Sequence, residues 1–295
     1  MMVDMSLLPQ PSEAFYWAQA AAGPALVCRP LEPIAFHLYT TRHWALGVRT
    51  AGGERGGWEQ VAAELELESA QLVRVRQVHG ASVVVARESR SDAADEADII
   101  VTDAPGLGLA VRAADCVPLL IADERTAAVA AAHGGWQGLA AGVPSAAVTA
   151  LTREFGSRPS DLVATIGPSI GACCYEVGTE VRDRFEAAGF GRGRIARWFR
   201  EEPRPSSRNP SMPGLPRPLR ASHWFFDGWS AASEQLLDAG VPADRIFVAD
   251  LCTASHPDTF CSYRREGFAA GRMVGAIRSR HGFRGGLRRG FAASP

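Results

Sequence analysis

The chain has 295 residues, of which 46% are hydrophobic and 21% are charged, and its formal net charge is -1. This composition excludes an intrinsically disordered or fibrous chain and is sufficient to build one hydrophobic core. A nearly neutral charge also argues against a dedicated nucleic-acid-binding protein, which normally carries a basic surface. We therefore expect a single globular domain with no nucleic-acid partner.

The N-terminal residues do not resemble an export signal. Their first charged residue is Asp4, they lack a basic start, and they contain Pro9 and Pro11 where an apolar run would lie. The chain also has no run of eighteen apolar residues, which excludes a membrane-spanning helix. We therefore expect a cytoplasmic protein without a membrane partner.

The cysteines favour metal binding or catalysis over a disulfide framework. Their number is even, but a long chain without an export signal rarely uses cysteines as structural crosslinks. Cys173 and Cys174 are neighbours in the sequence and cannot easily bridge each other without strain. The six cysteines are Cys28, Cys116, Cys173, Cys174, Cys252 and Cys261.

Regular structure is predicted from residue 34 onward. Residues 1–30 show no clear periodicity, so we expect a loosely ordered N-terminal segment there. Residues 34–42 are typical of a strand that runs into a polar turn, and residues 58–67 have the apolar spacing of a helix. Residues 72–86 alternate and turn at Gly80, as a pair of strands or one bent strand does.

The rest of the chain alternates groups of strands with helices. Three short apolar runs within residues 97–138 predict strands with buried faces. Further helices are predicted at residues 142–156, 177–188 and 230–240, strands at 161–171 and 246–253, and a short last segment at 271–277. This order favours an α/β fold of the α+β type, with a layered mixed sheet and helices in a single domain. Because no GxGxxG follows a strand and no GxxxxGK[ST] occurs, neither a Rossmann nor a P-loop fold is supported.

Two segments are predicted to be irregular. The segment from about residue 201 to residue 220 is Pro-rich, so we expect a mobile surface insertion that is dispensable for folding. Residues 279–295 form a basic, Gly-rich tail that solvent surrounds. The catalytic domain is therefore predicted to span residues 31–278.

One hairpin of this domain brings two potential metal ligands together. If its tip is Glu124–Arg125, Cys116 lies directly opposite His133. Opposed residues of an antiparallel pair have Cβ atoms about 4.5–5.5 Å apart on one face. A thiolate and an imidazole at that spacing suit zinc, although a one-residue slip would separate them, and a buried structural pair is the simpler alternative.

His79 is the third candidate ligand, because it also ends a strand beside a glycine. Three protein ligands with an open position are typical of catalytic zinc, whereas structural zinc normally has four. We therefore predict one zinc ion at His79, Cys116 and His133, which are also the catalytic residues, with water activated at the open position. Candidates for a fourth ligand are Cys173, Cys174, Cys252 and His256, although packing is the simpler role for the vicinal pair.

Several side chains are candidates for binding the substrate. Gly134 and Gly135 allow a ligand close to the backbone, and Trp136 offers an aromatic face or simply fills the core. The planar guanidinium of arginine suits an oxyanion such as phosphate, with a surface salt bridge as the alternative for each. The candidate arginines are Arg42, Arg264, Arg265 and Arg272.

The motifs QVHG, ADCVPLL, HGGWQG, IGPSIGACCYEVG, DLCT and CSYRREG…GRM occur in this order over about residues 72–277. In this respect the chain resembles the YfiH-type laccase-domain family, described first as multicopper polyphenol oxidoreductases and later as purine nucleoside phosphorylases. The resemblance implies that His79, Cys116 and His133 are metal ligands. It also implies a layered α/β fold, zinc, and phosphorolysis of adenosine, inosine and S-methyl-5'-thioadenosine, with adenosine deamination as a companion activity.

The chain departs from the family pattern at three places. Gln137 stands where the family usually has the Arg of HAGWRG, so we expect the loss of a charged contact, either on the phosphate side or within the structure. The segment TTRHWALGVRTAGG differs from the usual Gly-Gly-Val-Ser and Asn-Leu-Gly pattern, and the Pro-rich insertion has no counterpart.

Three other functions remain open. A Cys-His hydrolase or amidase that edits cell-wall precursors would use Cys116 as nucleophile and His133 as base. A polyphenol oxidase would hold copper in place of zinc. A non-enzymatic binding protein would use zinc for stability and would supply four protein ligands.

Overall fold

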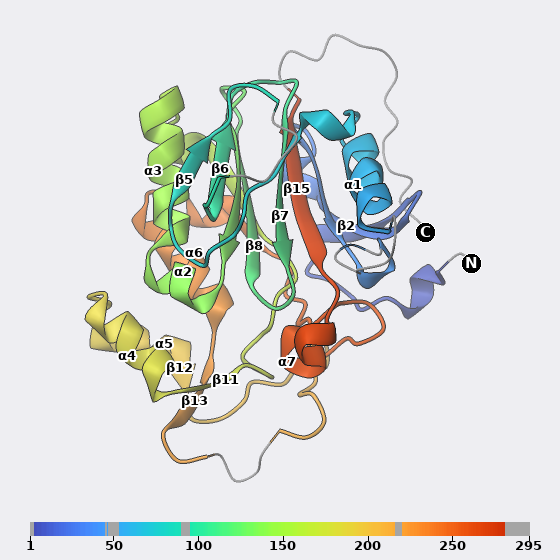
Figure 1. Ribbon diagram of the computed structural model, residues 1–295. Coiled ribbons are helices and arrows are strands. Elements are labelled where there is room, and N and C mark those ends of the chain that lie inside the picture. The colour runs from blue at the N-terminus through green and yellow to red at the C-terminus, as the bar shows by residue number, and fades with distance from the viewer. Residues whose placement is uncertain (1–2, 45, 47–52, 90–94, 216–219, 281–295) are drawn as a thin grey trace.

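The computed structural model describes residues 3–44, 46, 53–89, 95–215 and 220–280. Two six-stranded mixed sheets pack face to face, and helices cover the outer face of each (Figure 1). This arrangement confirms the predicted layered mixed architecture, which has two large sheets and not one.

The first sheet has the order β1-β2-β3-β15-β7-β4, and only the pair of β4 with β7 is parallel. The C-terminal strand β15 therefore lies inside the sheet, between β3 and β7 (Figure 1). The strands are β1 (Phe15–Ala20), β2 (Gly23–Cys28), β3 (Ala35–Thr40), β4 (Leu72–Val73), β7 (Gly108–Ala113) and β15 (Met273–Ser279).

The second sheet has the order β14-β10-β8-β9-β6-β5, with parallel pairs at both edges and antiparallel pairs between them. Its strands are β5 (Val83–Val85), β6 (Ile99–Thr102), β8 (Val117–Asp123), β9 (Val129–Gly134), β10 (Leu162–Ile166) and β14 (Ile246–Val248). A small third sheet, in the order β11-β13-β12, consists of β11 (Glu176–Gly178), β12 (Phe199–Arg200) and β13 (His223–Phe226).

Helix α1 covers the outer face of the first sheet, whereas α2, α3 and α6 cover that of the second. The α-helices are α1 (Gly53–Glu64), α2 (Trp136–Ala140), α3 (Val143–Phe155), α4 (Thr179–Ala187), α5 (Arg192–Trp198), α6 (Gly228–Asp238) and α7 (Tyr263–Glu266). Single 3-10 turns lie at Met5–Leu7, Arg29–Leu31, Arg42–Trp44, Ser69–Gln71, Pro159–Asp161, Ala243–Arg245 and Gly267–Ala269.

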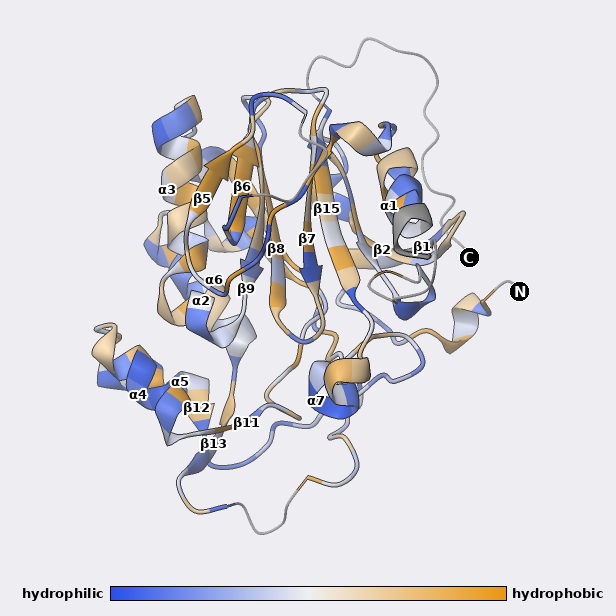
Figure 2. Ribbon diagram, in the orientation of Figure 1, coloured by the Kyte–Doolittle hydropathy of each residue, from blue (hydrophilic) through white to orange (hydrophobic). Residues whose placement is uncertain are grey.

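The apolar sequence runs follow from this layering, because successive side chains of a strand point to opposite faces. In β8, Leu120 and Ala122 face the first sheet, while Leu119 and Ile121 pack against the helices. Both faces are buried, so the strand is apolar throughout and does not alternate. Figure 2 accordingly shows hydrophobic strands in the middle and hydrophilic positions on the outer helices.

One local prediction is wrong, and a second is correct only in part. Within residues 1–30, expected to be loosely ordered, β1 and β2 form a hairpin whose Leu26 and Val27 are completely buried. Residues 72–86 contain two strands, but these do not pair with each other: β4 belongs to the first sheet and β5 to the second. The chain between them crosses from one sheet to the other, and this crossover contains His79.

The Pro-rich segment is irregular, as predicted, but the predicted mobility is not supported. Asn209 is buried, and its amide group hydrogen bonds to the backbone of Asp250 and Cys252. Residues 216–219 of this segment, and residues 281–295 of the basic tail, lie outside the described part of the chain. Among the described residues, no helix has the length and apolar character needed to cross a membrane.

Candidate metal centre

The hairpin of β8 and β9 places Cys116 and His133 at the same end of the second sheet. Its register differs from the prediction, because Pro118 and not Cys116 lies opposite His133. The loop is longer than expected: the Asp123 carboxylate accepts hydrogen bonds from the backbone N–H groups of Arg125 and Thr126. The register is shifted by two residues from the predicted one. Because side chains alternate with a period of two, Cys116, immediately before β8, still lies on the same face as His133 and is its diagonal neighbour.

His79 reaches this end of the sheet through the crossover between β4 and β5. Its φ angle is 61°, in the left-handed region that non-glycine residues seldom adopt. The carboxylate of Asp98 fixes this conformation, because it accepts hydrogen bonds from the backbone N–H groups of Val78, His79 and Gly80. The strained backbone is thus held in place by a buried acceptor.

The three side chains lie close enough to share one ion. One ligand atom from each of His79, Cys116 and His133 lies within 4.8 Å of the other two. The Nε2 atom of His79 is 4.0 Å from the Cys116 sulfur, and the two imidazole rings meet edge to face at 4.9 Å. His133 is buried, Cys116 half-buried and His79 exposed, so the group opens to solvent on one side.

Asp98 also orients His133. The Nδ1 atom of His133 is 2.8 Å from an Asp98 carboxylate oxygen, so Nδ1 donates and Nε2 remains available on the side of Cys116. A carboxylate behind a ligating histidine is the usual support of such a ligand.

The electrostatics favour the ligand form of the thiol. Burial alone would raise the pKa of Cys116, but the charge and hydrogen bonds of His133 and His79 lower it to about 6. Burial alone would lower the pKa of His133, but Cys116 and Asp98 raise it to about 9. A thiolate beside an imidazolium results, and a metal cation would replace the imidazolium proton as the positive partner.

Gly135 provides a test of whether these residues fit a metal ion. A Cβ atom at this position would lie 2.7 Å from the His79 ring and 3.2 Å from the Cys116 sulfur. The backbone therefore comes close to both donors without filling the space between them. One thiolate and two imidazoles around an open space match the ligands of zinc.

Asp115, next to Cys116, links this group to the loop that contains the predicted substrate arginines. Its φ angle is 88°, and its carboxylate accepts hydrogen bonds from Thr253, Ser262 and the backbone N–H of Arg264. The Arg264 guanidinium lies 5.1 Å from the ring centre of Tyr175 and donates to the carbonyl of Glu176. Arg264 is exposed, and its backbone is bound to Asp115, the neighbour of Cys116 in the sequence.

The other predicted substrate arginines have partners in the protein. Arg42 contacts the Pro257 carbonyl and the Glu266 carboxylate. Arg265 donates to the carbonyls of Thr253, Ala254 and Phe260 and also pairs with Glu266. Arg272 donates to the carbonyls of Ala270 and Gly271. These bonds stabilise the loops, and Arg264 is the candidate with the most direct link to Cys116.

Trp136 and Gln137 begin α2, directly after the two glycines. Trp136 is half-buried and packs against the core beneath the second sheet, whereas Gln137 is exposed. The structure therefore leaves the Gln137 side chain accessible to a ligand at this end of the helix.

The candidates for a fourth ligand do not join the three. Cys173, Cys174 and Cys252 form a separate group, and in the described part of the chain neither they nor His256 lie with His79, Cys116 and His133. Two residues that matter were missed in the sequence: Asp98 and Asp115. Asp98 directly precedes an almost fully apolar strand, and Asp115 directly precedes Cys116. A carboxylate in such a position is unusual, and this was the signal available in the sequence.

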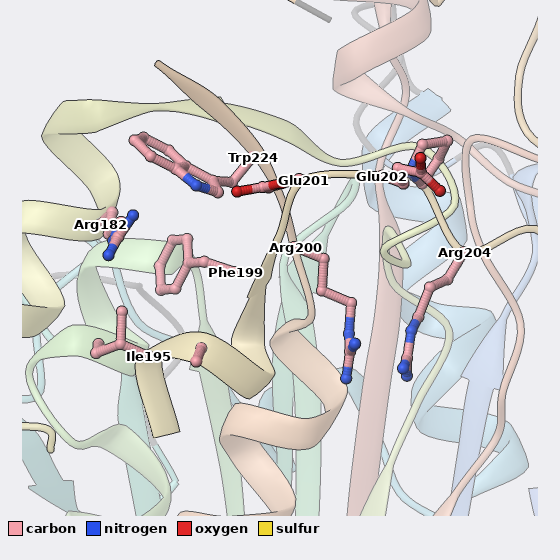
Figure 3. A pocket seen from close by; sticks show the side chains of 10 residues that line it. Arg182, Ile195, Phe199, Arg200, Glu201, Glu202, Arg204 and Trp224 are labelled. Carbon is pink, nitrogen blue, oxygen red and sulfur yellow. The ribbon is translucent and has the colours of Figure 1, made fainter. Parts of the chain in front are cut away.

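A hollow of about 540 Å³ lies elsewhere, between α4, α5 and the small sheet (Figure 3). The Arg182 guanidinium packs on the Trp224 ring, 4.7 Å from the ring centre. The side chains of Arg200 and Arg204 extend parallel to each other. Its lining includes none of the predicted site residues.

Comparisons with known proteins agree with the predicted resemblance. A family model described as multi-copper polyphenol oxidoreductase laccase matches residues 56–280. The crystal structure of the hypothetical protein YfiH from Bacillus licheniformis has a TM-score of 0.75 and 26% identity, and covers 89% of this chain and 98% of that one.

Two curated relatives have names that refer to nucleosides. A purine nucleoside phosphorylase from Bacteroides thetaiotaomicron is 34% identical over 190 residues, which is 64% of this chain and 63% of that protein. The adenosine deaminase RL5, from an unknown prokaryotic organism, is 31% identical over 225 residues, 74% of this chain and 78% of that protein. The alignment therefore spans just under two thirds of the Bacteroides protein.

Proposed function

Since the chain belongs to the multi-copper polyphenol oxidoreductase laccase family, we propose that it is a zinc-dependent purine nucleoside phosphorylase of the cytoplasm. Adenosine, inosine and S-methyl-5'-thioadenosine are the proposed substrates, with phosphate as the second substrate and adenosine deamination as a side activity. The observation that carries this proposal is the group of His79, Cys116 and His133, which is open on one side. The names of the relatives support the choice of nucleosides.

His79, Cys116 and His133 would hold the ion, and Asp98 would keep His133 in the ligating tautomer. Bound zinc would supply a Lewis acid and lower the pKa of water towards about 7. Gly135, which lacks a side chain, lets the backbone approach His79 and Cys116 closely, and a side chain there would collide with the His79 ring.

Phosphorolysis also requires an oxyanion held below the ribose C1′ atom, where positioning and charge do most of the work. Arg264 is exposed and next to Asp115, so it is the proposed phosphate contact. The Tyr175 ring and the Glu176 carbonyl orient its guanidinium.

The experiment is to incubate the zinc-loaded protein with adenosine, with and without phosphate, and to measure adenine and ribose 1-phosphate. We expect both products only with phosphate, and we expect Cys116→Ala to lose the activity together with one zinc ion. Cys261→Ala is the matched control, because this thiol is buried and belongs to neither cysteine group. Wild-type protein that binds zinc but consumes no phosphate would contradict the proposal.

Gln137→Arg tests the substrate side. A neutral amide lacks the charge assistance that makes arginine hydrogen bonds roughly twice as strong, so we expect the variant to lower the KM for phosphate. A change in stability without a change in kinetics would make this position structural.

A Cys-His hydrolase is the second candidate, because the lowered pKa of Cys116 beside His133 also suits a nucleophilic thiolate. Alkylation of Cys116 separates the two functions. A metal-bound thiolate should be protected until zinc is removed, whereas a nucleophile should react at the same rate with or without a chelator. Phenol oxidation by the copper-loaded protein would support the oxidase, and zinc binding without any turnover would support a binding protein.

A further inference from the structure

We propose a second zinc site, formed by the sulfurs of Cys173, Cys174 and Cys252 with the hydroxyl of Ser255, that is separate from the His79, Cys116 and His133 group. Metal at this site would connect two segments that are far apart in the sequence, the loop after β10 and the loop after β14, and the Pro-rich segment contacts the site through hydrogen bonds to Cys174 and Ser255.

The three thiols converge because two loops run beside each other at the end of the second sheet. Ser169, after β10, forms a parallel bridge with Cys252, after β14. The three sulfurs lie within 4.8 Å of one another, and each cysteine is at most 2% exposed. Around a tetrahedral zinc with Zn–S bonds of about 2.3 Å, sulfurs lie roughly 3.8 Å apart. The upper limit of 4.8 Å on the sulfur separations is compatible with this distance.

Ser255 provides an oxygen for the fourth position. Its Oγ atom is 3.4 Å from the Cys173 sulfur and 3.5 Å from the Cys174 sulfur. The hydroxyl proton is donated to the Pro210 carbonyl over 2.6 Å. Its lone pairs are consequently left for the side on which the sulfurs lie.

Backbone donors point at these sulfurs, as is expected for thiolates. The N–H of Gly171 donates to the Cys252 sulfur over 3.3 Å, and the N–H of Met212 donates to the Cys174 sulfur over 3.2 Å. Both donors would stabilise the sulfurs in the thiolate form that a metal ion requires.

Charge and coordination together favour zinc over copper(I). Three thiolates around a divalent ion leave one negative charge, whereas a monovalent ion would leave two in a buried place, which costs more. Zinc also prefers four donors, and the three sulfurs with the serine oxygen supply that number. The fully buried cysteines leave no open position for substrate, so this site is structural and differs from the open group at His79.

The competing explanation is apolar packing, because the same cysteines contact Ile170, Ala254 and Trp229. The test is to strip the full-length protein with a chelator under reducing conditions, add zinc alone, and count bound zinc by mass spectrometry. We expect two ions per chain in the wild type, and one in Cys174→Ser, in Cys252→Ser and in Cys116→Ala. Cys261→Ser, at a buried thiol outside both groups, should keep two.

Cobalt provides an independent reading of the ligands. In the cobalt-loaded protein, Cys252→Ser should lose most of the thiolate-to-metal absorption and Cys116→Ala only a minor part, since the groups contain three thiolates and one. One zinc per chain in the wild type, or two in folded Cys252→Ser, would overturn the proposal. If both cysteine variants fail to fold, the wild-type zinc count and cobalt absorption decide.

Discussion

Asp98 connects two of the three proposed ligands through a single carboxylate. It accepts hydrogen bonds from the backbone around His79 and from the ring of His133. Burial raises the pKa of Asp98, but the hydrogen bond to His133 and the backbone donors lower it by more. The pKa of Asp98 therefore lies below its ordinary value. Asp98 is therefore a charged acceptor that fixes two ligands while remaining outside the metal contacts.

Asp98→Asn should weaken zinc binding by about 10–100-fold, the usual effect of removing such a supporting group. The amide oxygen still accepts one bond, but the second acceptor and the charge behind His133 are lost. Zinc competition with a chromophoric chelator measures the change. Asp103→Asn, at an exposed carboxylate beyond the opposite end of β6, is the control and should bind zinc like the wild type. Equal affinity in both variants would contradict a supporting role.

His37, far from the metal centre, is a buried neutral imidazole. Its Nε2 atom accepts the N–H of Cys28 over 2.8 Å, and Nδ1 lies 3.2 Å from the Ala35 carbonyl. A proton on Nε2 would face the Cys28 N–H instead of accepting from it. Burial, with the charge of Arg280, lowers the pKa of His37 from 6.5 to about 4.

This pKa predicts acid sensitivity. Below pH 6.5 the unfolded chain takes up a proton that the folded chain binds only near pH 4, so stability falls as the pH drops through this window. The loss from this one group approaches ~3 kcal/mol. Urea unfolding at pH 7 and pH 4.5 should show a smaller loss in His37→Gln, because glutamine still accepts the Cys28 bond and does not titrate. His43→Gln, at an exposed histidine, should keep the full loss.

The sequence predicted which donors meet, because His79 and His133 each precede a glycine at the end of an apolar segment, and Cys116 lies at the start of the strand that pairs with the strand of His133. It did not predict how His133 is oriented, since Asp98 is separated from it by 35 residues and approaches only through strand pairing. Arg42 and Arg272 were predicted to bind substrate, but they bind carbonyl groups of the protein. A guanidinium group can donate to a phosphate or to a carbonyl, so the sequence alone does not identify its partner.

At the scale of elements, the Pro-rich segment is attached to the protein by Asn209. The side-chain oxygen accepts the N–H of Cys252 over 2.8 Å, and the side-chain nitrogen donates to Asp250. Proline-rich composition predicts the absence of helix and strand, but it does not report such a buried anchor.

Asn209→Ala should lower the free energy of unfolding by about 1–3 kcal/mol, because the buried N–H of Cys252 loses its acceptor. It should also speed limited proteolysis within residues 201–215. Urea titration and a protease time course measure the two effects. Ser207→Ala changes an exposed residue of the same segment and should have little effect on either. Unchanged stability in Asn209→Ala would restore the prediction of a dispensable insertion.

The hairpin and the crossover show why element predictions failed locally. The Asp123 side chain closes a loop longer than the tip of two residues that was assumed, and this moved the register. The alternation of residues 72–86 is real, but it cannot tell a hairpin from two edge strands in different sheets.

For the whole molecule, the contact between the two sheets includes one polar link. The Tyr39 hydroxyl, on β3, lies 2.9 Å from the Thr165 carbonyl and 2.7 Å from its hydroxyl, on β10. The ring occupies the space beside Gly167, where a Cβ atom would lie 2.3 Å from it. Tyr39 therefore sets both the spacing of the sheets and their polar contact.

Tyr39→Phe should lower the free energy of unfolding by about 1–3 kcal/mol, because the buried partners on Thr165 lose a hydrogen bond while the ring remains. Thermal and urea unfolding measure this loss. Tyr263→Phe removes the same atom from a tyrosine that is 44% exposed and should be close to neutral. Similar losses in the two variants would show that burial of the hydroxyl does not matter.

The layered class of the fold was predictable from groups of apolar strands and intervening helices. The division into two sheets was not, because β3, β7 and β15 come from residues 35–40, 108–113 and 273–279. Pairing between segments so far apart leaves no local pattern in the sequence.

The central place of β15 has a consequence for synthesis on the ribosome. Until residues 273–279 have emerged, β3 and β7 lack the neighbour that lies between them, and their hydrogen-bonding edges are unpaired. The nascent chain must therefore carry a split first sheet until residue 279 has left the ribosome, and during this time its unpaired strand edges are open to wrong pairing.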